Sequence, residues 1–328
     1  MSKLGIAGCN KITRLLSPLV LRMTSILQYL HPMSIRRHRL SLIAVMLAAM
    51  LWGTIGVAAK LFYATSNATP LTLSLLRLGI AAPLLGALSY ARDGRGFLRI
   101  QRASWQWWAL AALSMAGYQL FIFAAVQRTS VTAAQFLAIC TAPVLVAMLA
   151  PLALGERAPA RALGAGALAL AGATLVVGLG NPGDLLRRDY LTGNLLALAA
   201  AGAWAAYAIA ARHLVARHSV TRITFLTFSG AALLALPWAW PDLRALTLSP
   251  AGWLLAFYLG AVATALAYWL YVQGLREVTA TTSVFLALAE PATAALLAAA
   301  MFDERLSLAG WAGVGLLAAG LIWLARAA

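Results

Sequence analysis

Acidic residues, and charged residues in general, are scarce in this sequence. Only 9 of its 328 residues are Asp or Glu and 10% are charged, whereas 62% are hydrophobic and the mean hydropathy is +0.84. One or two water-soluble domains cannot bury so much apolar surface. The composition therefore excludes a soluble globular protein and predicts an integral membrane protein.

Cysteine and histidine are also rare. Cys9 lies in the N-terminal tail and Cys140 in an apolar segment, which excludes a disulfide framework and a cysteine-based metal site. The sequence contains no H-E-x-x-H metal motif, no G-x-S-x-G elbow and no Walker-type phosphate loop. It therefore offers no catalytic constellation, and we expect that the protein is not an enzyme. All four histidines fall on the predicted cytoplasmic side, which argues against a histidine proton relay within the membrane: His31, His38, His213 and His218.

Long apolar runs fill the chain after its first 40 residues. A helix needs about 20 apolar residues to cross a hydrocarbon core of about 30 Å. Short segments with turn residues separate the runs, and no stretch is left for a soluble domain. The predicted fold class is an all-α membrane protein with ten transmembrane helices, at 41–63, 70–90, 105–126, 131–153, 161–180, 193–211, 222–240, 251–273, 280–302 and 308–325.

The 25 Lys and Arg residues orient these helices. With the N-terminus in the cytoplasm, 18 of them fall on the cytoplasmic side and 5 on the opposite side. This asymmetry is the positive-inside signal of a protein in the cytoplasmic (inner) membrane with both termini cytoplasmic. The net charge of +16 is thus an orientation signal, and we expect no nucleic-acid partner.

The basic N-terminal tail, residues 1–40, precedes the first span. Its apolar stretch leads to His31-Pro32 and a basic cluster, with no small-residue cleavage site typical of a signal peptide. Two interpretations stay open. The tail either forms an interfacial amphipathic helix or results from a misassigned start codon, the chain then beginning at Met33.

The two halves of the chain resemble each other. An offset of 148 residues aligns Pro143 with Pro291 and Glu156-Arg157 with Glu304-Arg305. An offset of 152 aligns Trp52 with Trp204 and Lys60 with Arg212. Each half contains five spans, and because five is odd, the second half must enter the membrane from the opposite side. Inverted repeats of this kind are a recurring architecture of secondary transporters.

Several of these residues resemble a known family. The first half is similar to the EamA repeat of the drug/metabolite transporter superfamily at Leu51-Trp52-Gly53, Lys60, Arg77, Pro143 and Gly155-Glu156-Arg157. The second half repeats the pattern at Trp204, Glu290-Pro291 and Asp303-Glu304-Arg305. The resemblance implies two five-helix repeats, at 41–180 and 193–325, in a carrier without a prosthetic group. It also implies a small-molecule substrate, often an exported amino acid or another small metabolite. Asp303, where the first half has Gly155, departs from the pattern.

Three charged residues lie within the predicted spans, where ionisable groups are costly and are functional candidates. Glu290 lies near the midplane beside Pro291, where the helix is expected to kink, as at Pro143 in the first repeat. Its carboxylate would bind a proton or a substrate amine, or else be a protonated structural group. Arg77 would pair with a substrate carboxylate or tie neighbouring helices together, and Lys60 would snorkel to the interface.

Uncharged polar and aromatic residues are the remaining candidates for a substrate site. They offer flat apolar faces and hydrogen-bonding groups, as small-molecule sites do, although ordinary helix packing explains any one of them equally well. The substrate-binding candidates are Trp52, Tyr118, Gln119, Gln135, Trp204, Tyr207, Tyr268 and Glu290.

We therefore expect a secondary transporter, an exporter of amino acids or related small metabolites that works by alternating access between its two halves. The alternatives are a carrier of nucleotide sugars or other organic solutes in the same superfamily and, from another class, a channel. A channel is disfavoured because the duplicated halves can form the pathway within one chain. Proton coupling, lipid contacts and oligomeric state stay open.

The predicted orientation can be tested by labelling single cysteines in a chain whose native cysteines have been replaced. A cysteine at Asn67 should react with a membrane-impermeant maleimide from outside the cell, and one at Gly94 only from the cytoplasm, because the charge asymmetry places them on opposite sides. The reverse pattern would overturn the orientation.

Overall fold

Ten membrane-length helices make up the part of the chain that the computed structural model describes, residues 36–178, 187–302 and 306–327. The described residues from Ser41 onward belong to one compact unit. Among the described residues the β contacts are limited to an isolated antiparallel bridge between Ser66 and Leu248. The predicted all-α fold with ten transmembrane helices is therefore confirmed.

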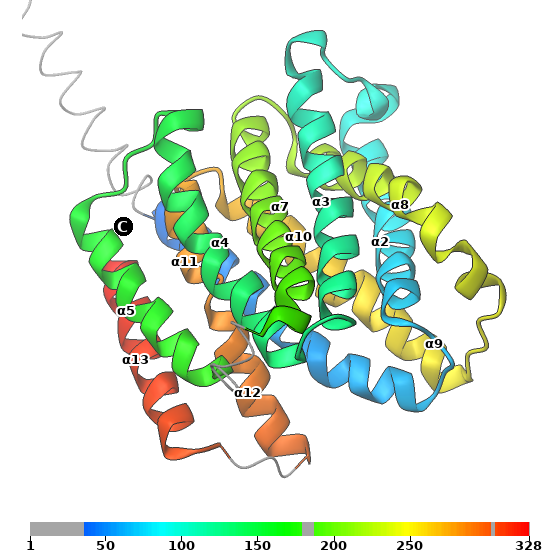
Figure 1. The fold of residues 1–328 in the computed structure, drawn as a ribbon. Helices are drawn as coiled ribbons and strands as arrows, with labels where there is room; N and C mark the ends of the chain where they lie inside the picture. The colour runs from blue at the N-terminus through cyan, green and yellow to red at the C-terminus, as the bar shows by residue number, and fades with distance from the viewer. Residues whose placement is uncertain (1–35, 179–186, 303–305, 328) are drawn as a thin grey trace, which may run out of the picture. The chain divides into compact units, whose positions relative to one another are not determined.

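The observed helices agree closely with the predicted spans. The largest extensions are at the end of the second span and at the beginnings of the first and sixth spans. Figure 1 shows their arrangement. In chain order they are the N-terminal helix Arg36–Ala64, α2 (Pro70–Asp93) with η1 (Gly94–Leu98), η2 (Arg102–Ser104) with α3 (Trp105–Val126), α4 (Val131–Leu154), α5 (Ala160–Val177), η3 (Arg188–Tyr190) with α7 (Leu191–Val215), α8 (Val220–Arg244), α9 (Pro250–Phe257) with η4 (Tyr258–Leu266) and α10 (Ala267–Gly274), α11 (Ala280–Leu286) with α12 (Ala289–Phe302), and α13 (Leu308–Ala327).

Hydroxyl side chains begin several of these helices. The side-chain oxygens of Thr69, Ser130, Ser249 and Thr279 each accept a hydrogen bond from the backbone N–H three residues later. Such caps satisfy amides that have no partner within the first turn. The turn residues between the apolar runs thus determine where the spans begin.

Two described spans depart from regular α-helix in their interior. The eighth contains the π-helical segment η4, and the ninth is interrupted at Ala287–Leu288, between α11 and α12. Pro291 lies in the first turn of α12, directly after the interruption, where a proline without an N–H is tolerated. In contrast, α4 continues as one helix through Pro143.

Corresponding spans of the two halves pack against each other. The second spans, α2 and α8, are in contact, and so are the fifth spans, α5 and α13 (Figure 1). At Gly172 a Cβ atom would lie 2.7 Å from the carbonyl oxygen of Gly313 and would clash with the backbone nitrogen of Leu317. The two backbones therefore approach closely because glycine is present, as is common between membrane helices.

Adding one methyl group at this contact should destabilise the protein. We expect Gly172→Ala to reduce the free energy of unfolding by about 1–3 kcal/mol because the backbone of α13 cannot move away cheaply. Thermal unfolding in detergent measures the change. The control is Gly315→Ala on α13, where a Cβ atom meets nothing within 4 Å. Equal stability of the two variants would contradict the close packing.

Candidate functional site

A cavity of about 670 Å³ lies within the helix bundle. It is lined by residues of the N-terminal helix, of α2, α3, α4, α5, α7, α10, α11 and α12, and of the break between the last two. The structure brings most of the predicted site residues to this one cavity, although they come from distant parts of the sequence. Those in the lining are Trp52, Arg77, Tyr118, Gln119, Gln135, Pro143, Trp204, Tyr268, Glu290 and Pro291.

Two predicted residues lie outside the lining. Tyr207 is fully buried behind the lining aromatic rings. The ammonium group of Lys60 lies 3.8 Å from the centroid of the Phe302 ring, near the end of α12. Neither side chain forms part of the cavity wall in this conformation.

Packed aromatic rings lie at one end of the cavity and are here called the aromatic floor. Trp52, Trp204 and Tyr268 line the cavity, and Tyr207 and Tyr271 pack against them from outside the lining. The centroid of the Trp52 ring lies 5.3 Å from that of the Trp204 ring and 4.8 Å from that of the Tyr268 ring. The tilted and edge-on arrangements are those that aromatic pairs prefer. Trp52 and Trp204, which match in the two repeats, thus meet at the centre of the floor.

Glu290 lies in the first turn of α12, directly after the interruption of the ninth span. The N-terminal helix comes very close at this point, because a Cβ atom at Gly53 would lie 2.8 Å from the carbonyl oxygen of Glu290. The N-terminal end of a helix favours negative charge. No described residue donates a hydrogen bond to the Glu290 carboxylate, which faces the cavity.

Arg77 is the basic residue of the cavity lining. Its Nε donates a hydrogen bond to the hydroxyl oxygen of Thr264 at 3.1 Å. Thr264 belongs to the π-helical segment and donates in turn to the carbonyl oxygen of Leu259 at 2.7 Å. Arg77 and Glu290 interact electrostatically across the cavity without a direct ion pair.

The cavity reaches the opposite end of the bundle, here called the open end. Its lining includes Tyr63, Val126, Val177 and Ala298, which lie at or close to the ends of the N-terminal helix, α3, α5 and α12. All four of these helices end on the same side of the bundle. The cavity thus extends from the middle of the bundle toward one side only.

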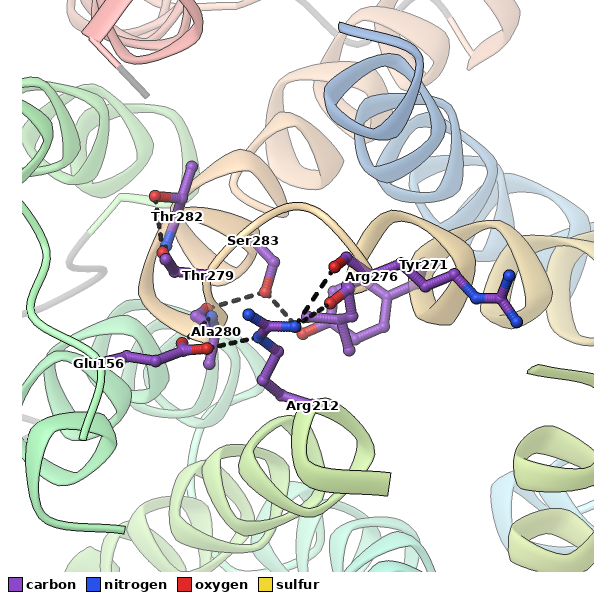
Figure 2. A network of polar contacts seen from close by, with 9 residues as sticks. Glu156, Arg212, Tyr271, Arg276, Thr279, Ala280, Thr282 and Ser283 are labelled. Carbon is purple, nitrogen blue, oxygen red and sulfur yellow. Dashed lines mark hydrogen bonds and ion pairs between the residues drawn. The ribbon is translucent and has the colours of Figure 1, made fainter. Parts of the chain in front are cut away.

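Beyond the aromatic floor, a polar network joins four spans at the other end, here called the closed end (Figure 2). Arg212 of α7 forms an ion pair with Glu156, which follows α4. Its Nη1 also donates to the carbonyl oxygen of Leu275 at 2.8 Å, and the second carboxylate oxygen of Glu156 accepts from the N–H of Ala280 at 2.9 Å. Glu156 therefore also caps the beginning of α11.

A second ion pair lies on the same side of the bundle. Arg222 contacts Asp93 at 3.2 Å, and the Ser219 hydroxyl donates to the same carboxylate oxygen. Burial, together with neighbouring Arg222 and Arg217, lowers the pKa of His218 from its ordinary value. Its neutral form is therefore favoured. The pair of Asp93 and Arg222 joins α2 to α8.

Glu156, Arg212 and Thr264 are not among the site residues predicted from the sequence. Glu156 and Arg212 lie just outside the predicted spans 131–153 and 193–211, although both recur in the repeat alignment. That recurrence at matched helix ends was the available signal. The counterpart of Glu156 in the second half, Glu304, lies outside the described residues, as do Asp303 and Arg305. The counterpart of Arg212 in the first half is Lys60. Thr264 carried no signal, because neither charge nor a motif distinguishes it from other threonines.

The described residues contain no group of three or more His, Cys, Asp or Glu side chains able to hold a metal ion. The polar and aromatic groups of the described lining are one carboxylate, one guanidinium, two side-chain amides, several hydroxyl groups and aromatic rings. This set suits reversible binding of a small polar molecule.

Comparison with known proteins gives a consistent result. The EamA-like transporter family matches residues 39–178 and 191–326. The chain is 33% identical over 284 residues, 86% of this chain and 93% of the relative, to the uncharacterized transporter YwfM of Bacillus subtilis. It is 30% identical over 224 residues, 64% of this chain and 75% of the relative, to the aromatic amino acid exporter YddG of Ancylobacter novellus.

A solved crystal structure shares the fold, with a TM-score of 0.74 and 22% identity over 87% of this chain and 96% of that one. The two matched segments each cover one set of five spans. This confirms the resemblance noted from the sequence motifs and the architecture of two repeats. The chain is an integral membrane protein that belongs to the EamA-like transporter family.

Proposed function

We propose that this transporter exports amino acids or related small metabolites across the cytoplasmic membrane by alternating access. The observation that carries the proposal is the cavity, which runs from the middle of the bundle to one side and is closed on the other by the aromatic floor and the Glu156–Arg212 pair. Access from only one side at a time is what a carrier requires and a channel does not.

The direction of access follows from the charge asymmetry. Arg212, Arg217 and Arg222 belong to the closed end and count among the basic residues of the cytoplasmic side. The structure then represents a carrier open to the outside and closed to the cytoplasm. Return to the inward-open state would require the closed-end network to break.

Both the lining and one relative support amino acids as substrates. The aromatic floor presents flat apolar surface to the cavity, and the relative YddG is named as an aromatic amino acid exporter. A carrier for nucleotide sugars needs several cations to match the phosphates, whereas Arg77 is the basic residue of the described lining. The site therefore favours amino acids over phosphorylated solutes.

Replacing the cavity carboxylate should impair transport. We expect Glu290→Gln to reduce selective export at least about tenfold and to change its pH dependence, because a charged hydrogen-bonding partner or proton site is lost. Proteoliposomes loaded with amino acids, amines, nucleobases, sugars and nucleotide sugars are followed by mass spectrometry. The matched control is Glu277→Gln, which removes an exposed carboxylate.

Export and pH dependence unchanged by Glu290→Gln would remove this residue from the mechanism. Selective loss of sugars or nucleotide sugars, with amino acids retained, would replace the proposed substrate class. An unselective leak of the whole pool would favour a channel.

Loosening the closed-end network should open the cytoplasmic side. We expect Glu156→Gln to accelerate hydrogen–deuterium exchange of the backbone amides of α11, because the closure loses about 1–3 kcal/mol when Arg212 is left without its carboxylate. Exchange measured by mass spectrometry on peptides covering residues 275–286 tests this.

The control for that experiment is Asp189→Asn, which removes an exposed ion pair with Arg187. Exposed pairs contribute little, and exchange in α11 should not change. If Glu156→Gln left the exchange of α11 as slow as in the control, the network would not hold this end closed.

A further inference from the structure

The π-helical segment η4 packs against α2 beside Arg77, which lines the cavity. A Cβ atom at Gly260 would lie 2.5 Å from Cβ of Ile80 and 3.3 Å from the carbonyl oxygen of Arg77, so the two helices are in close contact here. A π-helical turn widens the helix and redirects its side chains, and such turns are frequent at functional sites. In η4 it allows the Thr264 hydroxyl to bond five residues back, to the Leu259 carbonyl.

This hydroxyl constrains one edge of the Arg77 guanidinium. Because the hydroxyl proton is used in the bond to Leu259, the oxygen is left as an acceptor for Nε of Arg77. Thr264 therefore fixes the guanidinium by a single hydrogen bond, in which the acceptor is an uncharged hydroxyl oxygen. Among the described residues the two terminal amino groups form no further hydrogen bond, although Arg77 lines the cavity.

A guanidinium fixed in this way within a membrane protein has unused binding capacity. A structural arginine would be expected to bond several carbonyl groups or a carboxylate, since an uncompensated charge is costly in this environment. The planar terminal edge matches a carboxylate, which it can bind through two parallel hydrogen bonds. Glu290, of opposite charge, faces the same cavity from α12 without a direct ion pair to Arg77.

We propose that Arg77 is the carboxylate-binding residue of this transporter, that Thr264 on the π-helical segment positions it, and that Arg77 and Glu290 together select solutes carrying both a carboxylate and an ammonium group. A zwitterion placed between them would neutralise both side chains at once. The inference rests on the proposed function and deepens it, because it names the groups that recognise each end of the substrate.

The aromatic floor and the indole N–H of Trp52 complete the site. The buried Trp52 Nε1 has no hydrogen-bond partner among the described residues, and its ring belongs to the cavity lining. A buried donor without a partner is costly, and a ligand oxygen would satisfy it. The apolar part of the solute would then lie against the floor.

Three related probes separate the contributions of the two charges: L-phenylalanine, 3-phenylpropanoate, which lacks the ammonium group, and 2-phenylethylamine, which lacks the carboxylate. Dissociation constants are measured from ligand-induced thermal stabilisation of the purified protein. We expect Arg77→Gln to raise the dissociation constants of L-phenylalanine and 3-phenylpropanoate at least about tenfold. The dissociation constant of 2-phenylethylamine should change less than about threefold. Glu290→Gln should weaken L-phenylalanine and 2-phenylethylamine instead.

The positioning role of Thr264 is tested by two variants of similar size. Thr264→Val removes the hydroxyl and should raise the dissociation constants of the two carboxylate probes about three- to tenfold. Thr264→Ser keeps the hydroxyl and should bind both probes as the wild-type protein does. The control for overall charge is Arg128→Gln, an exposed arginine after α3, which should leave all three probes unaffected.

Equal weakening of all three probes by Arg77→Gln would overturn the carboxylate assignment, and equal effects of Thr264→Val and Thr264→Ser would overturn the positioning role. No binding of carboxylate probes to the wild-type protein would also reject the proposal. Because binding is measured without a gradient, these outcomes are independent of the export assay. If the wild-type protein exports amino acids but Arg77→Gln weakens binding of all three probes equally, this inference alone is rejected. If Arg77→Gln weakens only the carboxylate probes but the wild-type protein exports no amino acid, the proposed function alone is rejected.

Discussion

Inside a bilayer every backbone N–H and C=O group must find a partner within the protein, and irregular backbone is tolerated only where it lines a cavity or is buried in protein. This constraint explains the whole arrangement of the site. Two spans depart from the α-helix in their interior, at η4 and at Ala287–Leu288. In η4, Thr264 accepts a hydrogen bond from Arg77 of the cavity lining, and Ala287 and Leu288 line the cavity themselves. The first orients Thr264 and Arg77, and the second places Glu290 at a helix N-terminus.

The two ends of the cavity are built from different interactions. The closed end combines packed aromatic rings with an ion pair that joins α4, α7, α10 and α11. A partly buried ion pair is a suitable element for a reversible closure. Its attraction is offset by the cost of removing the charges from water, so that the closed and separated states can differ by little free energy. Hydrophobic packing alone would lack the directional bonds that define one closed arrangement.

Sequence duplication does not make the site symmetric. Pro143 and Pro291 match in the repeat alignment, yet α4 is continuous through Pro143 whereas the ninth span is broken next to Pro291. A proline removes one hydrogen bond, and the neighbouring helices decide whether the freed carbonyl is satisfied within a continuous helix or at a break. The residue before each proline differs too, since Ala142 corresponds to Glu290.

The sequence alone determined the membrane fold, the ten spans and the two repeats, and it singled out ten of the residues that line the cavity. These properties depend on apolar length, charge distribution and repeated motifs, which are local or additive along the chain. Only the tertiary structure decided that Tyr207 lies outside the cavity lining, that Glu156 and Arg212 form an ion pair, and that Thr264 accepts a hydrogen bond from Arg77. Such contacts depend on how helices distant in sequence are rotated against each other, and no periodicity or motif specifies that rotation.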